Sequence, residues 1–143
     1  MKSILRPVAL ITLPVAFVVA GAVIADPEEK KISFTKQIKP IFADKCIHCH
    51  NRKTLPNRIS FESRKLALGK TKEGLSYIVP GDSAKSLMIT ALNAPTFHEK
   101  KMPMVGPRPT KEEIELIRRW IDQGADWPTG LRGRIKPTFR AKE

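Results

Sequence analysis

The stretch Cys46-Ile47-His48-Cys49-His50 decides how the rest of this 143-residue sequence is interpreted. Two thiols lie three positions apart, and an imidazole directly follows the second one. In a helical turn, this spacing lets each sulfur add to one of two neighbouring vinyl groups on a porphyrin edge and carries the next residue under the ring. The pattern C-x-x-C-H therefore predicts one covalent haem c, attached through Cys46 and Cys49, with His50 as an iron ligand.

Three other uses of these residues are compatible with parts of the pattern. A redox-active C-x-x-C pair of thioredoxin type requires a strand–helix–strand setting, which the sequence does not predict. A zinc site needs four ligands, which Cys46, Cys49 and His98 with either His48 or His50 would supply without the usual second close pair. A structural disulfide is common in exported proteins, but it leaves His50 unexplained. Haem attachment uses both thiols and the imidazole, so it is the interpretation we favour.

Residues 1–25 have the layout of a secretory signal peptide. Lys2 and Arg6 form a short positive start, an uncharged apolar run follows, and small residues precede an expected cut ahead of Asp26. An uncleaved membrane anchor is the alternative, because the run is nearly long enough to cross a hydrocarbon layer of about 30 Å. Both interpretations place the remaining chain outside the cytoplasm, and we expect an exported, periplasmic protein.

The chain is strongly basic, with 26 Lys and Arg residues against 14 Asp and Glu, a formal net charge of +12. Residues 1–25 hold two of the basic residues and none of the acidic ones, so the remainder has 24 against 14, or +10. This balance favours acidic partners, although it is equally compatible with a charge that serves only solubility. Export argues against nucleic acid. We expect redox protein partners with acidic docking surfaces, and membrane association if the N-terminal segment is retained.

Helical spacing of apolar residues predicts an all-α fold, and the resemblance described below implies that it is cytochrome c-like. Between residues 33 and 45 the apolar positions follow the period of a helix, and Pro40 interrupts them, so we expect a kink or two short helices. A short helix is expected over residues 61–68, and the next helix is expected to begin at a cap formed by Asp82 or Ser83.

The strongest helix signal begins at Thr110, which forms a capping box with Glu113. The apolar stripe of this helix predicts a buried face made by Ile114, Ile117, Trp120 and Ile121. Trp127 follows the helix, and we expect its indole N–H to donate to a haem propionate. Residues 129–143 are predicted to form a basic tail that is mobile or loosely docked.

A methionine is the expected sixth ligand of the iron, since its thioether favours the reduced metal. Met88 falls on the apolar stripe of a helix, where core packing is the expected role. Met102 and Met104 flank Pro103 in a stretch with four prolines and no helical period, which predicts an irregular loop. We favour Met102 as the distal ligand, with Met104 as the alternative and His98 as a weaker third candidate.

Several segments in a fixed order resemble the planctomycete-type cytochrome c domain, a branch of the class I-like haem folds. They are FTKQIKPIF (34–42), CIHCH (46–50), ISFESR (59–64), IVPGDS (78–83), KMP (101–103) and LIRRWIDQGADWP (116–128). The resemblance covers residues 33–128 and implies several helices wrapped round one haem, with the first and last helices crossing. It also implies that Met102 is the distal ligand. Many members have a second proline after K-M-P, where this chain has Met104.

The sequence therefore predicts a monohaem electron carrier rather than an enzyme. No second haem motif, carboxylate pair or nucleophile arrangement suggests catalytic residues. The alternative is a haem c enzyme or small-gas sensor, peroxidase-like in chemistry, whose sixth iron site is open or only weakly held. The expected organisation is a signal peptide or anchor over 1–25, a cytochrome c domain over 33–128 and the tail over 129–143.

Overall fold

The computed structural model describes residues 30–56 and 58–137. Within these ranges the chain forms helices and irregular segments and no β-strand; one isolated antiparallel bridge joins Lys70 and Ser76. The elements are η1 (Phe34–Ile38), α1 (Lys39–Lys45), α2 (Arg64–Ala67), α3 (Leu87–Asn93), α4 (Lys111–Asp122) and α5 (Gly130–Gly133). Within the described ranges, no helix is long and apolar enough to span a membrane. The predicted signal peptide lies outside the described residues.

The first helical segment is divided as the sequence predicts. The Ser33 hydroxyl accepts a hydrogen bond from the Lys36 amide at 3.4 Å, and a wide turn with five-residue spacing follows, in which the Lys39 amide donates to the Phe34 carbonyl. Pro40 then falls in the first turn of α1, where its missing amide N–H costs no helical hydrogen bond. The two pieces present one buried apolar face to the interior.

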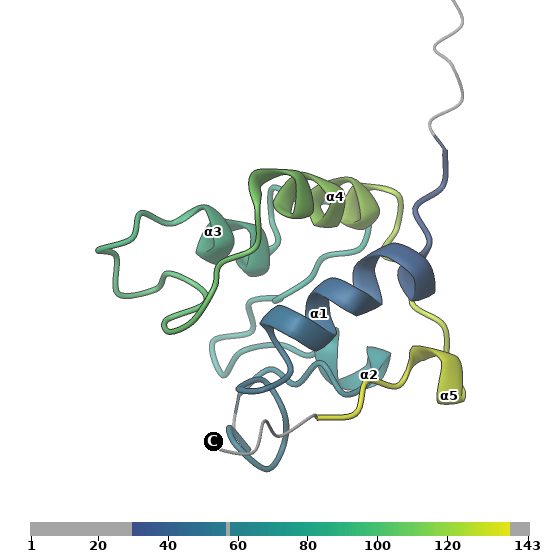
Figure 1. Ribbon diagram of the computed structural model, residues 1–143, viewed down its shortest axis with the longest axis horizontal. Helices are drawn as coiled ribbons and strands as arrows, with labels where there is room; N and C mark the ends of the chain where they lie inside the picture. Colours follow the sequence, from purple (N-terminus) through teal and green to yellow (C-terminus); the bar gives the residue numbers. More distant parts are fainter. Residues whose placement is uncertain (1–29, 57, 138–143) are drawn as a thin grey trace, which may run out of the picture.

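Helix α4 begins with the predicted capping box and packs against the apolar face of the first helical segment. The Thr110 hydroxyl accepts from the Glu113 amide at 3.2 Å, and the Glu113 carboxylate accepts from the Thr110 amide at 2.8 Å. Ile117, Trp120 and Ile121 are buried as predicted, whereas Ile114 is only half-buried. Figure 1 shows α4 beside α3 and across from the first helical segment, and η1 contacts both α4 and α5.

Two predicted helices differ from the structure. The helix expected over 61–68 is reduced to α2. The Phe61 amide donates to the His50 carbonyl at 2.9 Å, and the Phe61 ring packs against Phe42 at 4.9 Å between centroids, so Phe61 is bound to other segments before the helix begins. Helix α3 begins later than expected, with Ser86 as its N-cap. Asp82 instead caps the turn before it, where its carboxylate accepts from the Lys85 amide at 3.0 Å.

The segment after α4 is docked rather than loosely held, which corrects the prediction over residues 129–137. Trp127 donates its indole N–H to the Gly133 carbonyl at 2.7 Å, so the predicted bond to a propionate is wrong. The Ile135 amide donates to the Glu62 carbonyl at 3.1 Å, and the Ile135 side chain is only 2% exposed. One apolar residue thus anchors the basic segment; residues 138–143 lie outside the described part.

Candidate functional site

The five residues of the C-x-x-C-H motif form a compact turn at the end of α1. The Cys46 amide still donates to the Phe42 carbonyl at 3.1 Å, and the Cys49 and His50 amides both return to the Cys46 carbonyl, at 3.3 and 2.9 Å. Cys46 is half-buried, Cys49 is exposed, and both are free thiols. We call residues 46–50 the attachment turn. Its hydrogen bonds keep the two sulfurs and the imidazole within about one helical turn of each other.

Asn51 fixes the attachment turn from inside the protein. Its fully buried side-chain amide donates to the carbonyls of Ile47 and His48 at 2.8 and 3.0 Å and to the Thr54 hydroxyl at 3.0 Å. Its side-chain oxygen accepts from the amides of Lys53 and Thr54 at 3.0 and 2.9 Å. One side chain therefore satisfies five polar groups that would otherwise need water. This role of Asn51 was not predicted from the sequence, although an asparagine directly after the motif is a recognisable signal for a side-chain-capped turn.

The His50 ring is oriented by the backbone of a different segment. Its Nδ1 lies 3.3 Å from the Ile59 carbonyl oxygen. A carbonyl only accepts, so Nδ1 donates and the lone pair is at Nε2, the tautomer that can bind a metal. Phe61 packs edge-on against the imidazole, with 5.4 Å between centroids. Burial lowers the pKa of His50, which favours the neutral, ligand-competent form.

The two thiols differ in their surroundings. Burial raises the pKa of Cys46 to about 12, and the carboxylates of Glu113 and Asp44 act in the same direction. Cys46 is therefore a protonated thiol at neutral pH and packs against the apolar core. Cys49 lies at the surface. The first thiol therefore lies against the apolar interior, and the second is accessible to solvent.

The candidate distal ligands lie in different environments. Met102 is half-buried and packs against the core, and its amide donates to the Ala91 carbonyl at 3.0 Å, which ties the loop to α3. Met104 is 64% exposed. Met88 is buried in the core, as predicted for a packing residue. Among the methionines of this loop, Met102 is the one with a fixed backbone and a side chain directed toward the apolar interior.

The other residues considered as ligands do not come together with the cysteines. His98 is exposed, and its Nδ1 accepts from the Lys100 amide at 3.0 Å. Among residues 30–56 and 58–137, no three His, Cys, Asp or Glu side chains form a group that could hold a metal ion. The four-ligand zinc arrangement is therefore not present there, and the two cysteines form no disulfide.

A second polar cluster, also missed in the sequence, links the attachment turn to the C-terminal segment. The Glu62 carboxylate accepts from the Arg52 amide at 2.9 Å, the Arg52 Nε at 3.1 Å and the Ser60 hydroxyl at 2.9 Å. The backbone carbonyl of Glu62 accepts from Ile135. Burial alone would raise the pKa of Glu62, but these donors together lower it. Glu62 thus joins the residues that follow the attachment turn to the docked end of the chain.

Residues 46–103 match the family described as planctomycete cytochrome C. The match confirms the resemblance predicted from the sequence and spans the attachment turn, the Glu62 cluster and the loop as far as Pro103. No curated protein and no solved structure matches this chain. The family implies a haem c, and the residues present fit it: two free thiols, a neutral and oriented imidazole, and a half-buried thioether.

Proposed function

We propose that this chain, with its match to the planctomycete cytochrome C family, is a monohaem c-type cytochrome that transfers single electrons between redox partners. Cys46 and Cys49 would hold the haem through thioethers, and His50 and Met102 would ligate its iron. The bound haem would supply an iron that exchanges one electron. The protein's own residues bind, orient and shield this group, and none of them makes or breaks a substrate bond.

The observation that carries the proposal is the oriented imidazole within the attachment turn. His50 follows Cys49 directly, its Nδ1 donates to the Ile59 carbonyl, and burial keeps the ring neutral. An imidazole with one nitrogen fixed by a carbonyl and the other unprotonated is the arrangement that proteins use for metal ligation. A structural disulfide or a thiol redox pair would give this histidine no role.

The choice of Met102 rests on its fixed backbone and its packing. A ligand must return to the same position after each electron transfer, so a loop held to α3 by the Met102–Ala91 hydrogen bond is better suited than an exposed position. Met104, two residues later, has a mostly exposed side chain. A methionine ligand and burial both raise the potential of a haem relative to an exposed one with a nitrogen ligand.

We also propose that the protein works outside the cytoplasm, in the periplasm, with acidic redox proteins as partners. The layout of residues 1–25 supports export, and covalent haem attachment to such motifs takes place outside the cytoplasm. The net charge of +12 supports acidic partners, because it accelerates their approach at low ionic strength. If residues 1–25 are retained, they would hold the protein at the membrane.

A redox titration of the purified protein, followed by absorption, tests this function. A single reversible one-electron transition, with a low-spin spectrum in both states, is expected for the electron carrier. A high-spin ferric spectrum that changes on addition of azide would instead indicate the haem enzyme or gas sensor with an open sixth site. Absence of any reversible transition would contradict electron transfer altogether.

A further inference from the structure

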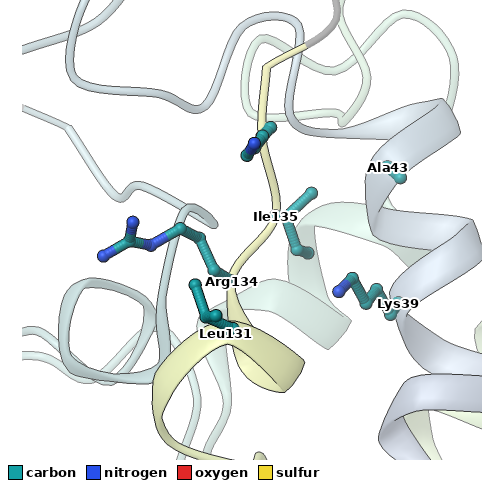
Figure 2. A pocket seen from close by; sticks show the side chains of 6 residues that line it. Lys39, Ala43, Leu131, Arg134 and Ile135 are labelled. Carbon is teal, nitrogen blue, oxygen red and sulfur yellow. The ribbon is translucent and has the colours of Figure 1, made fainter.

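A basic hollow lies between α1 and the docked C-terminal segment. Its volume is about 410 Å³, and its lining is Lys39, Ala43, Leu131, Arg134, Ile135 and Lys136. Figure 2 shows Lys39 and Ala43 on α1, Ile135 directed toward that helix, and Lys39 and Arg134 on opposite sides of Leu131. We call this feature the α1–α5 hollow.

The hollow combines an apolar centre with a cationic lining. Ala43, Leu131 and Ile135 supply the apolar part, and three basic side chains supply the charge; none of the lining residues is acidic. The Lys39 ammonium group donates to the Arg132 carbonyl at 3.0 Å, which fixes one of the cations beside α5. Leu131 is 81% exposed, so an apolar side chain is accessible beside these cations.

The positive charge and the concave shape of the hollow favour one kind of occupant over three others: a second copy of the chain, residues 138–143 and a lipid surface. A second copy of this chain has a net charge of +12 and would be repelled by the three cations of the hollow. Residues 138–143 contain two basic residues, Arg140 and Lys142, and one acidic residue, Glu143, so this segment is also basic. Neither occupant complements the charge of the hollow. A concave surface also fits a protruding side chain better than it fits a flat lipid layer. The complement is a protein segment with an apolar side chain flanked by carboxylates.

We propose that the α1–α5 hollow is a docking site for an acidic segment of a partner protein, which inserts one apolar side chain against Leu131 and Ala43. The carboxylates of that segment would pair with Arg134 and Lys136. Ala43 lies on α1, three residues before Cys46, which directly follows the end of that helix; a partner docked here would therefore lie about 5 Å along the helix axis from the attachment turn. The identification of that partner as a redox protein rests on the proposed function; the docking site itself does not.

Titration of the isotope-labelled, reduced protein with synthetic peptides tests this inference by nuclear magnetic resonance. The probe is the capped peptide Glu-Glu-Leu-Glu-Glu, and the comparison peptides replace its leucine with serine or its glutamates with lysines. We expect amide shifts at Ala43 and over residues 131–136 with the probe, weaker binding of the serine peptide and no binding of the lysine peptide.

Matched variants separate the hollow from overall charge. The double substitution Arg134→Glu with Lys136→Glu should weaken probe binding by about tenfold. The double substitution Lys70→Glu with Lys72→Glu changes the net charge equally at two exposed residues outside the lining, and should weaken binding by less than about threefold. Leu131→Ser should reduce binding of the probe to the level of the serine peptide. Unchanged amide spectra away from the substitutions would show that each variant is folded.

Three results would overturn the inference. They are equal losses in the two double variants, probe-induced shifts confined to residues outside the hollow, and binding to phosphatidylglycerol vesicles without binding to the probe. Haem staining of the same samples separates this inference from the proposed function. A protein that binds the probe but contains no haem contradicts only the function, whereas a haem protein that ignores the probe contradicts only the docking site.

Discussion

The side-chain amide of Asn51 donates a 2.8 Å hydrogen bond to the carbonyl oxygen of Ile47, across the turn that presents Cys46, Cys49 and His50. This bond is one of five that the buried side chain makes with the attachment turn and the residues after it. The turn between the cysteines therefore has a defined conformation that does not depend on the thiols themselves.

Substitution Asn51→Ala should lower the free energy of unfolding by about 2–3 kcal/mol, because it leaves several buried polar groups without partners. Thr54→Val removes the hydroxyl that accepts one of these bonds and should cost about 1 kcal/mol. Urea denaturation of the two variants and the wild type measures both values. Equal losses in the two variants would show that Asn51 does not hold the turn.

The ionisation of Glu62 should make the free energy of unfolding depend on pH in the acid range. Burial raises its pKa, but the hydrogen bonds from Arg52 and Ser60 outweigh burial, so the pKa is lower in the folded protein than in the unfolded chain. The stabilisation is therefore present above the unfolded-state pKa, about 4.5, and is lost as pH falls through the folded-state pKa.

The substitution Glu62→Gln should accordingly cost about 1 kcal/mol at neutral pH, and its difference from wild type should shrink as pH falls to about 2.5. Urea midpoints measured across this range check the prediction. The exposed Glu112 also has a lowered pKa but makes no contact with the attachment turn, so Glu112→Gln is the control and should change stability little. A Glu62→Gln deficit that stays constant with pH would contradict the ionic role of Glu62.

Gly133 should be intolerant of any side chain. A Cβ atom built there would lie 1.7 Å from the Pro128 carbonyl oxygen, a backbone atom that cannot move without displacing α5. Gly133→Ala should therefore cost about 1–3 kcal/mol and release the Trp127 indole from its bond to the Gly133 carbonyl. Thermal unfolding and tryptophan fluorescence measure these effects. Thr129→Ala is the control, since the Thr129 side chain makes no capping hydrogen bond, and a similar loss in that variant would contradict the explanation.

Met102 and Met104 should behave differently when each is replaced by alanine. The sulfur-to-iron charge-transfer band of the ferric protein should be present in wild type, vanish in Met102→Ala and persist in Met104→Ala, because Met104 is mostly exposed. Absorption spectroscopy of the three proteins checks this. A band that survives Met102→Ala and is lost in Met104→Ala would assign the ligand to the other sulfur.

Local signals in the sequence predicted the parts of the fold that depend on neighbouring residues. The Thr110–Glu113 capping box, the division at Pro40 and the burial of Trp120 all follow from patterns within a few positions, and the structure confirms them. The iron ligands and thioether attachments stay predictions, since the family match over residues 46–103 does not test the individual ligands.

The features that the sequence did not predict depend on contacts between distant segments. Ile135 is one of few apolar residues in a basic, glycine- and proline-containing stretch, and its anchoring depends on its burial in the core and on its bond to Glu62. The orientation of His50 depends on the Ile59 carbonyl, nine residues later. The bond of Trp127 to Gly133 likewise requires the chain to turn back at α5, which no local pattern specifies.

Haem staining after denaturing electrophoresis tests the central claim most directly, because only covalently bound haem remains with the unfolded chain. The protein should be produced in a host that matures c-type cytochromes, beside a variant with Cys46→Ala and Cys49→Ala. We predict a stained band for the wild type and none for the double variant. An unstained wild-type band, in a host that stains a control cytochrome, would contradict the proposal that Cys46 and Cys49 attach haem.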